Sequence, residues 1–422
     1  MSDHSPKRVL VLGAGFGGLT FCQELSAPSA EVTVVDRQNH HLFQPLLYQV
    51  ATAGLSAPEI AQPIRSILSD QENTRVILDE VKEIRLAEKS VVLQGQTVSY
   101  DYLVIALGGI TAYFGHPEWA EHAPGLKSLE DAVRIRRQVL LCFERAESEL
   151  DPAAQKRLMT LVVVGGGPTG VELAGALAEL TRFVLTKDFR RIDPALAQVI
   201  LIEASPVVLS NFPQELAINA TATLRAMGVD VRTERKVRSI TQGAVELDNG
   251  EVLEAETILW AAGVGASPLT RQLGVELDRA GRVKVNPDCS VPGHPEVFAI
   301  GDLVSLMNED GKPIPGVSPA AMQMAKHVAG IVSRELQSRT VAPVESRPPF
   351  RYRDKGSMAT IGRSAAVAHF KEFQLTGFAA WLAWLLVHVL FLIGFRNKLA
   401  VLIQWAYSYL TYTRGSRIIT KI

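Results

Sequence analysis

The stretch Val9–Leu19 constrains this chain most, because an apolar run leads directly into closely spaced glycines. Gly13, Gly15 and Gly18 stand at the G-x-G-x-x-G spacing. We expect the first glycine to make a tight turn, the second to admit a pyrophosphate, and the third to let a helix pack on the strand. The free N–H groups of that helix would face the phosphates. Asp36 ends the next apolar segment, where a carboxylate can bind an adenosine ribose, so the pattern predicts a Rossmann unit.

The same pattern recurs later in the chain, after the apolar run that ends at Val164. Gly165, Gly167 and Gly170 take the fingerprint positions, and Glu203 ends the following apolar segment. An internal repeat of this kind predicts two dinucleotide-binding domains. No Arg follows Glu203 within six residues, so a 2′-phosphate would meet a carboxylate. This arrangement favours NADH over NADPH.

Composition narrows the class of protein further. A chain of 422 residues with a net charge of -1 suggests two or three domains and gives no indication of nucleic-acid binding. Cys22, Cys142 and Cys289 are scattered along the chain, so we expect neither a disulfide framework nor a metal site, and we expect a reducing compartment. Only seven residues precede the first strand, and we therefore expect no secretory signal.

Two candidate residues carry alternative interpretations. Glu172 lies in the first turn of the second predicted helix, where it either stabilises the helix dipole by about 0.3–1 kcal/mol or faces a nicotinamide or flavin ring. Asp302 follows an apolar strand, where it either caps a helix or, as we expect, accepts hydrogen bonds from a ribityl chain. His40 and His41 are interpreted as structural rather than catalytic, because no carboxylate or metal partner stands near them in sequence.

The C-terminal tail has a distinct composition. The segment 377–395 has 19 residues of which only His388 is polar, and the segment 399–412 has only 14 residues, too short to cross back through a bilayer. We therefore expect helices that lie on a membrane surface, with Trp and Tyr side chains at the head-group level, among them Trp381, Trp384 and Trp405. Residues 373–422 contain no acidic side chain and five basic ones that could attract anionic lipids, namely Arg396, Lys398, Arg414, Arg417 and Lys421.

Several further motifs make the chain similar to the type II NADH:quinone oxidoreductases, which are single-subunit, non-pumping respiratory enzymes. These motifs are the loop HHLFQPLLYQVATA at 40–53, GGGPTGVELAG at 165–175, FAIGD at 298–302, DKGSMATIG at 354–362, and the tail FLIGFRNK at 391–398 followed by Arg414–Gly415. The resemblance implies FAD in the first domain, NADH in the second, and a membrane quinone at the flavin face opposite the nicotinamide. It assigns Glu172 to the nicotinamide side and Gln323 to the quinone side as catalytic residues. One departure is His327, which stands where the family often has a second Gln.

The resulting candidate site residues fall into two sets. The FAD set is Gly13, Gly15, Phe16, Gly17, Gly18, Asp36, Arg37, Gln44, Tyr48, Val81, Ala106, Gly108, Asp302, Ala321, Met322 and Gln323. The NADH set is Gly165, Gly167, Pro168, Thr169, Gly170, Glu172, Glu203, Ala262, Gly263 and Val264.

The predicted fold is α/β, with an FAD domain (1–115 and 281–350), an inserted NADH domain (116–280) and a C-terminal amphipathic helical membrane-binding segment (351–422). We expect the protein to transfer electrons from NADH through FAD to a quinone, with anionic lipids and a second copy of the chain as further partners. We expect it at the cytoplasmic face of a bacterial-type inner membrane. The alternatives are a sulfide:quinone oxidoreductase-like flavoprotein and a membrane-tethered FAD- and NADH-binding sensor without turnover. A disulfide reductase would need a C-x4-C pair, which the sequence lacks near the first fingerprint.

Overall fold

The computed structural model describes residues 5–411 and 414–419, and the chain divides into two units. The first unit consists of Met1–His41, Gln62–Ile110 and Val264–Asp354. The second unit consists of Leu42–Ala61, Thr111–Gly263 and Lys355–Ile422. The loop after His41 and the C-terminal tail therefore belong with the second glycine-rich turn, whereas the prediction from motifs grouped that loop with the first. Tyr412 and Lys421, which the tail prediction included, lie outside the described residues.

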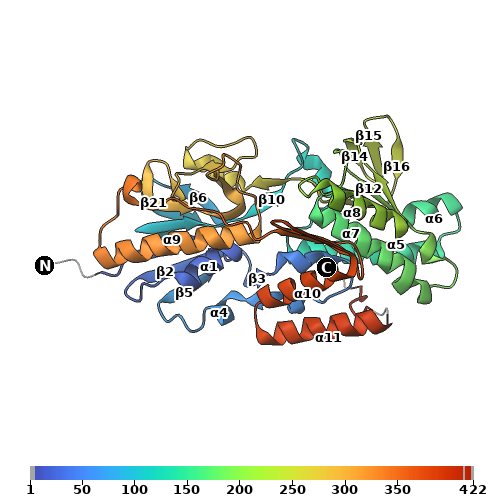
Figure 1. Cartoon of the computed structure of the whole chain (residues 1–422), viewed down its shortest axis with the longest axis horizontal. Coiled ribbons are helices and arrows are strands. Elements are labelled where there is room, and N and C mark those ends of the chain that lie inside the picture. Colours follow the sequence, from blue (N-terminus) through green and yellow to red (C-terminus); the bar gives the residue numbers. More distant parts are fainter. Residues whose placement is uncertain (1–4, 412–413, 420–422) are drawn as a thin grey trace. The chain divides into compact units, whose positions relative to one another are not determined.

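A six-stranded sheet forms the centre of the described part of the first unit (Figure 1), in the order β20-β21-β9-β1-β2-β5. Its strands are β1 (Arg8–Leu12), β2 (Glu31–Asp36), β5 (Thr74–Leu78), β9 (Tyr102–Ile105), β20 (Ser290–Val291) and β21 (His294–Ala299). All neighbouring strands except β20 and β21 are parallel. Four of the five residues of β1 are buried, as expected of a parallel strand that is covered on both faces.

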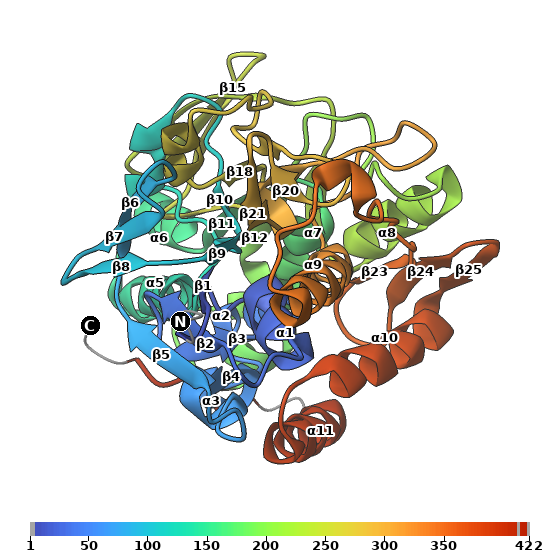
Figure 2. The ribbon, with the colours of Figure 1, turned by 90° about the vertical axis from the view of Figure 1, so that its left-hand side faces the viewer.

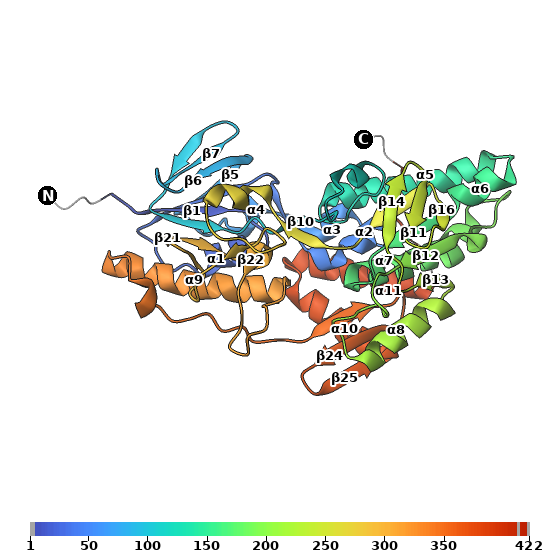
Figure 3. The ribbon, with the colours of Figure 1, turned by 90° about the horizontal axis from the view of Figure 1, so that it is seen from above.

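Helices and a small antiparallel sheet cover the two faces of this sheet. Figure 3 shows α1 (Phe16–Glu24) and α9 (Ser318–Ser338) on one face and the sheet β6-β7-β8 on the other. The strands of this smaller sheet are β6 (Val81–Arg85), β7 (Ser90–Leu93) and β8 (Thr97–Ser99). Shorter elements complete the unit: α4 (Ile64–Ile67), β19 (Val283–Lys284), β22 (Val304–Ser305), and the 3-10 helices η6 (Pro268–Leu273), η7 (Gly301–Leu303) and η8 (Val344–Ser346). Four strands lie at the points in the sequence where the chain passes from one unit to the other. They are β3 (His40–Leu42), β4 (Ala61–Pro63), β10 (Gly109–Thr111) and β18 (Val264–Ala266).

The second unit is built around a parallel sheet in the order β13-β12-β11-β17. Its strands are β11 (Thr160–Val164), β12 (Gln198–Ile202), β13 (Val229–Arg232) and β17 (Thr257–Trp260), and an antiparallel sheet consists of β14 (Val237–Thr241), β15 (Ala244–Leu247) and β16 (Val252–Glu254). The larger helices are α5 (Leu129–Ser148), α6 (Pro152–Leu158), α7 (Pro168–Glu179) and α8 (Gln214–Ala226), and the short ones are η1 (Gln44–Leu46), α2 (Leu47–Ala51), α3 (Ala57–Ile60) and η2 (Pro117–Glu121). Helix α7 continues into a π-helical turn, η3 (Leu180–Val184), and then into the 3-10 helices η4 (Leu185–Lys187) and η5 (Pro194–Leu196). These turns contain most of the insertion that lengthens the second fingerprint.

The C-terminal part of the second unit consists of a three-stranded sheet and two helices. The elements are β23 (Ser357–Thr360), β24 (Ala366–Phe370), β25 (Phe373–Thr376), α10 (Gly377–Phe391) and α11 (Phe395–Thr411). Figure 2 shows α10 and α11 side by side, with β24 and β25 next to α10. Among the described residues, no helix is long and apolar enough to span a bilayer.

The inner face of this helix pair is part of the core. Ala380, Trp384, Leu392 and Val401 are all at most 2% exposed. The expectation that Trp384 lies at a lipid head-group level is therefore wrong, because its indole ring is buried inside the protein and stacks on His388 at 3.9 Å.

Candidate functional site

The first glycine-rich turn has the geometry that the spacing predicts. Gly13 has φ of 95°, and a Cβ there would lie 2.4 Å from the carbonyl oxygen of Ala106. A Cβ on Gly18 would lie 1.8 Å from the carbonyl oxygen of Gly13. At Gly15, in contrast, no protein atom lies within 4 Å of the Cβ position. Two glycines are thus required by packing, and the third leaves open space at the N-terminus of α1, whose first turn has no side-chain cap.

Asp36 is held at the end of β2 in a position to receive a hydroxyl group. Its carboxylate accepts hydrogen bonds from the backbone N–H of Ala14 at 2.6 Å and of Gln38 at 2.7 Å. A carboxylate has further acceptor capacity beyond these two bonds. His41 supports the same turn, since its Nδ1 donates to the carbonyl oxygen of Ala14 at 3.0 Å and its ring packs edge-on against Phe16. Burial lowers the pKa of His41, and its position in the turn agrees with a structural role.

The other FAD candidates of the first unit lie on several elements. Asp302 stands in η7 beside Gly109, with its carboxylate 3.3 Å from the Cβ position of that glycine, and no donor among the described residues reaches it. Gln323, on α9, exchanges hydrogen bonds of 3.0 and 2.9 Å with the backbone of Arg353. His327, one turn later, is half-buried and packs against Phe350. The remaining candidates are exposed Arg37, half-buried Met322, Val81 in β6, buried Ala106 and Ala321, and Gly108 with φ of 66°.

These residues fit the adenosine and pyrophosphate parts of FAD. The open position at Gly15 is a space that a Cβ would fill, and the α1 N-terminus offers the N–H donors that a pyrophosphate requires. The carboxylates of Asp36 and Asp302 have the acceptor capacity that ribose and ribityl hydroxyl groups would require.

The second turn repeats this geometry within the second unit. Gly165 has φ of 110°, and its Cβ position lies 2.7 Å from the backbone nitrogen of Ala262. The Cβ position of Gly170 lies 1.8 Å from the carbonyl oxygen of Gly165, while Gly167 has no protein atom within 4 Å. Glu203 accepts hydrogen bonds from the backbone N–H of Gly166 at 2.5 Å and of Ser205 at 2.6 Å.

The remaining NADH candidates surround this turn, with one exception. Pro168 and Thr169 are exposed at the start of α7. Ala262 and Gly263 follow β17 in the second unit, whereas Val264 begins β18 and belongs to the first unit. The structure therefore brings most of the NADH set together at one turn.

Glu172 lies in the second turn of α7 and is directed at β23. The backbone N–H of Thr360 lies 3.4 Å from its Oε1. Burial raises the pKa of Glu172 to about 8, an effect that the Thr360 N–H opposes. A carboxyl group that titrates near neutral pH can hold or release a proton there.

Tyr48 and Gln49 lie on α2, beside Thr360, in the second unit. The Tyr48 hydroxyl lies 3.0 Å from Thr360 Oγ1, and Gln49 Nε2 donates to the same hydroxyl at 3.0 Å. The indole Nε1 of Trp405, on α11, donates to Gln49 Oε1 at 2.7 Å. Gln44 is exposed, and its Nε2 donates to the carbonyl oxygen of Lys127. Thr360, Gln49 and Trp405 were not among the candidate site residues, because their contacts join segments more than 300 positions apart, which no short motif links.

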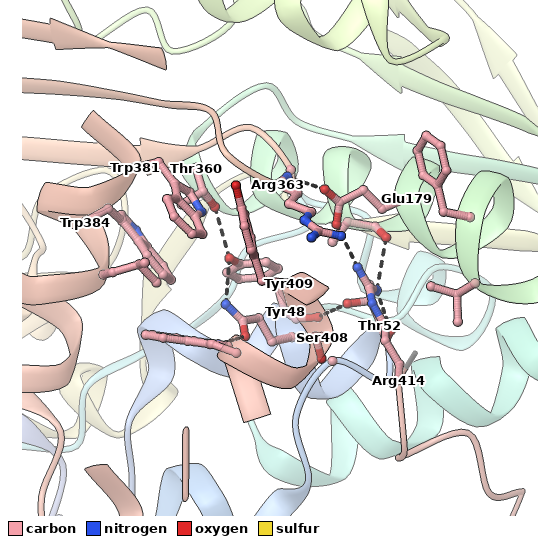
Figure 4. Close-up of a pocket in the computed structure, with 18 residues that line it drawn as sticks. Tyr48, Thr52, Glu179, Thr360, Arg363, Trp381, Trp384, Ser408, Tyr409 and Arg414 are labelled. Carbon is pink, nitrogen blue, oxygen red and sulfur yellow. Dashed lines mark hydrogen bonds and ion pairs between the residues drawn. The ribbon is translucent and has the colours of Figure 1, made fainter. Parts of the chain in front are cut away.

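A cavity of about 120 Å³, partly open to solvent, adjoins this group of residues. Figure 4 shows Trp381 and Trp384 on one side, Arg363, Glu179 and Arg414 on the other, and Tyr48 and Thr360 between them. All the lining residues belong to the second unit. The cavity therefore combines aromatic walls with a few polar groups, as small-molecule sites commonly do.

Arg414 and Arg417 form ion pairs within the protein, which corrects the expectation that they hold anionic lipids. Arg414 Nη2 binds Glu179 Oε2 at 2.8 Å, and Arg414 Nη1 donates to the carbonyl oxygen of Thr52 at 2.8 Å. The Arg414 side chain is 12% exposed. Arg417 pairs with Asp188. Glu179 and Asp188 lie more than 200 positions earlier in the chain, so the composition of the tail alone could not reveal these partners.

The three cysteines are all buried and free. Burial raises the pKa of Cys22 to about 12 and also raises the pKa values of Cys142 and Cys289. Reactive thiols require the opposite shift. These side chains therefore do not fit the disulfide or persulfide chemistry of a sulfide oxidoreductase.

Comparison with known proteins identifies the class of this fold. The family model "Pyridine nucleotide-disulphide oxidoreductase" matches residues 7–325, and the model "NDH2 C-terminal domain" matches residues 355–412. The solved structure of NDH2 from Plasmodium falciparum in complex with NADH superposes with a TM-score of 0.89 at 19% identity, over 98% of this chain and all of that chain. The sulfide:quinone oxidoreductase from Aquifex aeolicus gives a TM-score of 0.72 at 18% identity, over 93% and 92% of the two chains. The fold is thus that of the pyridine nucleotide–disulphide oxidoreductases.

Sequence similarity defines the family more narrowly. The type II NADH:quinone oxidoreductase Ndh of Mycobacterium tuberculosis is 43% identical over 98% of this chain and 90% of its own length. A second type II NADH:quinone oxidoreductase of that organism, NdhA, is 41% identical over 98% and 89% of the two chains. The chain belongs to the type II NADH:quinone oxidoreductase family. The resemblance and the fold predicted from the motifs are confirmed.

Proposed function

We propose that this protein transfers electrons from NADH through FAD to a membrane quinone, without pumping protons. Family membership confirms the predicted enzyme class and the predicted cofactor and substrate, FAD and NADH. The observation that carries the proposal is the pair of glycine-rich turns with equivalent open positions at Gly15 and Gly167. Two turns of this kind in one chain fit one bound dinucleotide and one dinucleotide substrate.

When bound, FAD supplies the ring system that accepts a hydride and passes on electrons. The residues of this chain bind and orient the reactants. The Glu203 carboxylate accepts a hydrogen bond from a hydroxyl group of the NADH ribose, and its negative charge disfavours a 2′-phosphate. Glu172 holds or releases a proton near neutral pH at the N-terminal part of α7. The roles of Glu172 and Gln323, and of the other site residues, remain predictions.

We place the quinone head group in the cavity beside Thr360 and the aromatic side chains of α10 and α11. Gln323, the quinone-side residue that the resemblance implied, does not line this cavity. Trp384 supports this assignment, because its side chain is 1% exposed and its indole Nε1 has no acceptor among the described residues. A buried donor without an acceptor costs free energy, and a quinone carbonyl would satisfy it.

The outer face of α10 and α11 supports attachment to a membrane surface. Large apolar side chains are exposed along it at helical spacing, namely Phe378, Leu382, Leu386 and Leu390 on α10 and Leu399, Leu402, Ile403 and Leu410 on α11. Exposed apolar surface of this extent marks an interaction site, and two adjacent helices of this type fit an interfacial position.

Cations near the turn between these helices are the candidates for contact with anionic lipids. Arg396 is exposed, Lys398 Nζ donates to the carbonyl oxygen of Leu390, and Lys355 Nζ lies 5.8 Å from the centroid of the Phe391 ring. They replace Arg414 and Arg417 in the proposal. A homodimer and a location at the cytoplasmic face of a bacterial-type inner membrane remain predictions.

Absorbance spectroscopy tests the function directly. Addition of NADH to the purified protein should bleach the flavin band, and a subsequent addition of quinone should restore it. A protein whose flavin is bleached but not restored by any quinone would contradict the proposal and favour a sensor. Charge reversal of Arg396 and Lys398 should weaken vesicle binding and make it easier to release with salt, since each such cation is worth about 1 kcal/mol.

A further inference from the structure

A chain of hydrogen bonds connects Trp405 on α11 to Thr360 on β23, along one side of the cavity. It runs from Trp405 Nε1 to Gln49 Oε1, from Gln49 Nε2 to the Tyr48 hydroxyl, and from that hydroxyl to Thr360 Oγ1, over distances of 2.7, 3.0 and 3.0 Å. Tyr48 and Thr360 are 7% and 2% exposed, so water does not compete freely for these groups. All four side chains line the cavity.

The donor at the α11 end fixes the direction of the first two hydrogen bonds. An indole N–H can only donate, so the carboxamide of Gln49 must present its oxygen to Trp405 and its NH₂ group to Tyr48. The Tyr48 oxygen therefore accepts a hydrogen bond from Gln49. Its single proton then has one remaining partner among the described residues, which is Thr360 Oγ1. When Tyr48 donates to Thr360 Oγ1, the Thr360 proton is left for another acceptor; when Thr360 donates to the second lone pair of Tyr48, the Tyr48 proton is left instead. In either arrangement, one hydroxyl proton of this pair has no acceptor among the described residues.

We propose that the pair adopts the first arrangement when a quinone is bound, so that Thr360 donates its hydroxyl proton to a carbonyl oxygen of the quinone, and that Trp405 and Gln49 are positioning residues that keep the Gln49 NH₂ group directed at Tyr48. The inference rests on the proposed function, because it assigns a role in quinone binding to residues of the same cavity. The backbone N–H of Thr360, not its hydroxyl group, makes the contact with Glu172. The hydroxyl proton is therefore available to a ligand.

The unsatisfied indole of Trp384 is an independent observation in support. It lines the same cavity and is buried, and no acceptor among the described residues meets its Nε1. Trp384 and Thr360 both line a space bounded by aromatic rings (Figure 4). A flat ring that carries carbonyl oxygens offers acceptors to such side chains, whereas a hydrocarbon chain offers none.

The first test removes only the Thr360 hydroxyl group. Thr360→Val keeps the β-branched shape and the backbone N–H, and we expect it to raise the KM for quinone about fivefold to tenfold, as the loss of one hydrogen bond predicts. Thr360→Ser restores the hydroxyl group and should return the KM to within about twofold of the native value. An unchanged KM in Thr360→Val would overturn the inference.

The second test reverses the chain without touching Thr360. In Gln49→Glu, an ionised carboxylate accepts from both Trp405 and Tyr48, so Thr360 must donate to Tyr48 and is lost to the ligand. The KM for quinone should rise at least as much as in Thr360→Val. Gln374→Glu adds the same charge at an exposed position of β25 and should behave as the native protein. An effect of equal size in both variants would show that charge, not hydrogen-bond direction, is responsible.

Trp405→Phe completes the series, because it keeps an aromatic ring and removes the N–H that orients Gln49. We expect a smaller rise in the KM for quinone, of about twofold to threefold, since Gln49 is then free to adopt either orientation. A rise as large as that in Thr360→Val would indicate loss of packing instead.

The two proposals fail in different ways. If the native protein does not reduce quinone, the proposed function is wrong. If the native protein reduces quinone but Thr360→Val and Gln49→Glu do so with native KM values, only the hydrogen-bond assignment is wrong. The flavin content of each variant, read from its absorbance, verifies that the protein remains folded.

Discussion

The two glycine-rich turns have nearly the same backbone and differ in what covers them. In both, the first glycine has a positive φ, the last glycine packs against the carbonyl oxygen of the first, and the middle one leaves open space. In the first unit, Gly17 is buried against Ile300, and Phe16 packs against His41. In the second unit, Pro168 and Thr169 are exposed. The two turns thus differ in the residues beside the open position, which pack against the protein in the first and are exposed in the second, while Gly15 itself is exposed and Gly167 is half-buried. We expect the packed neighbours to suit a cofactor that stays bound and the exposed ones a substrate that exchanges.

The largest expected effects come from alanine at the two open positions. Gly15→Ala and Gly167→Ala add a methyl group that meets no protein atom within 4 Å, so folding is spared and only ligand approach is blocked. Gly15→Ala should purify with little FAD. Gly167→Ala should keep its FAD and raise the KM for NADH about tenfold or more, a cost of at least 1.4 kcal/mol. Absorbance spectra and NADH titrations measure both quantities.

A control for this pair is Gly330→Ala in α9, where a Cβ also meets no atom within 4 Å. It should change neither ligand and should stabilise the helix by up to about 1 kcal/mol. If Gly15→Ala and Gly167→Ala produced the same defect, the distinction between a cofactor turn and a substrate turn would be lost.

The helices that follow the two turns also differ at their last residues. Glu179, at the end of α7, forms a buried ion pair with Arg414, whereas the ion pair of Glu24, at the end of α1, is exposed. Arg414→Ala should lower the free energy of unfolding by about 3–5 kcal/mol, since it leaves a buried carboxylate without its partner. Arg417→Ala breaks a more exposed pair and should cost at most about 1 kcal/mol. Chemical denaturation of the full-length protein measures the difference, and equal losses would contradict the buried position of Arg414.

Asp36, the last residue of β2, and Glu203, which follows β12, should bind different ligands. Glu203→Gln should lower kcat/KM for NADH severalfold. It should also reduce the ratio of kcat/KM for NADH to that for NADPH, because a neutral amide no longer repels a 2′-phosphate. Asp36→Asn should reduce FAD content without changing the NADH to NADPH preference. Steady-state kinetics with both nucleotides test this, and a native protein that uses NADPH as well as NADH would refute the assignment of Glu203.

The smallest effect concerns pH, since α7 carries Glu172 in its first turns and α1 carries no acid there. Because folding raises the pKa of Glu172 to about 8, its neutral form stabilises the fold at low pH, and this contribution is lost as the pH rises through 8. Relative to Glu172→Gln, the native protein should lose a few degrees of Tm, to order of magnitude, between pH 5 and pH 9. A pH-independent difference in Tm would show that Glu172 does not titrate in this range.

The turns could be predicted residue by residue, because a G-x-G-x-x-G run and the acid after the next strand encode local geometry. Gly13, Gly18, Gly165 and Gly170 are positions where a Cβ would clash with nearby backbone, and sequence spacing is enough to identify them.

The tail was predicted less well, because its contacts are not local. Composition suggested that Arg414 and Trp384 meet lipid, but Glu179 pairs with the first, and the core around α10 buries the second. The hydrogen-bond chain to Thr360 was invisible for the same reason, since its members come from α2, β23 and α11.

The inert thiols have a practical consequence for experiments on the membrane-facing helices. Because Cys22, Cys142 and Cys289 are buried and their pKa values are raised, thiol-directed probes should ignore the native protein. A reporter cysteine can therefore be introduced without first removing the natural ones. A spin label at Phe378→Cys, on the exposed apolar stripe of α10, should register contact with lipid-soluble oxygen. The same label at exposed Gln374→Cys in β25 should register water, and the pair would measure the depth at which the protein rests on its membrane.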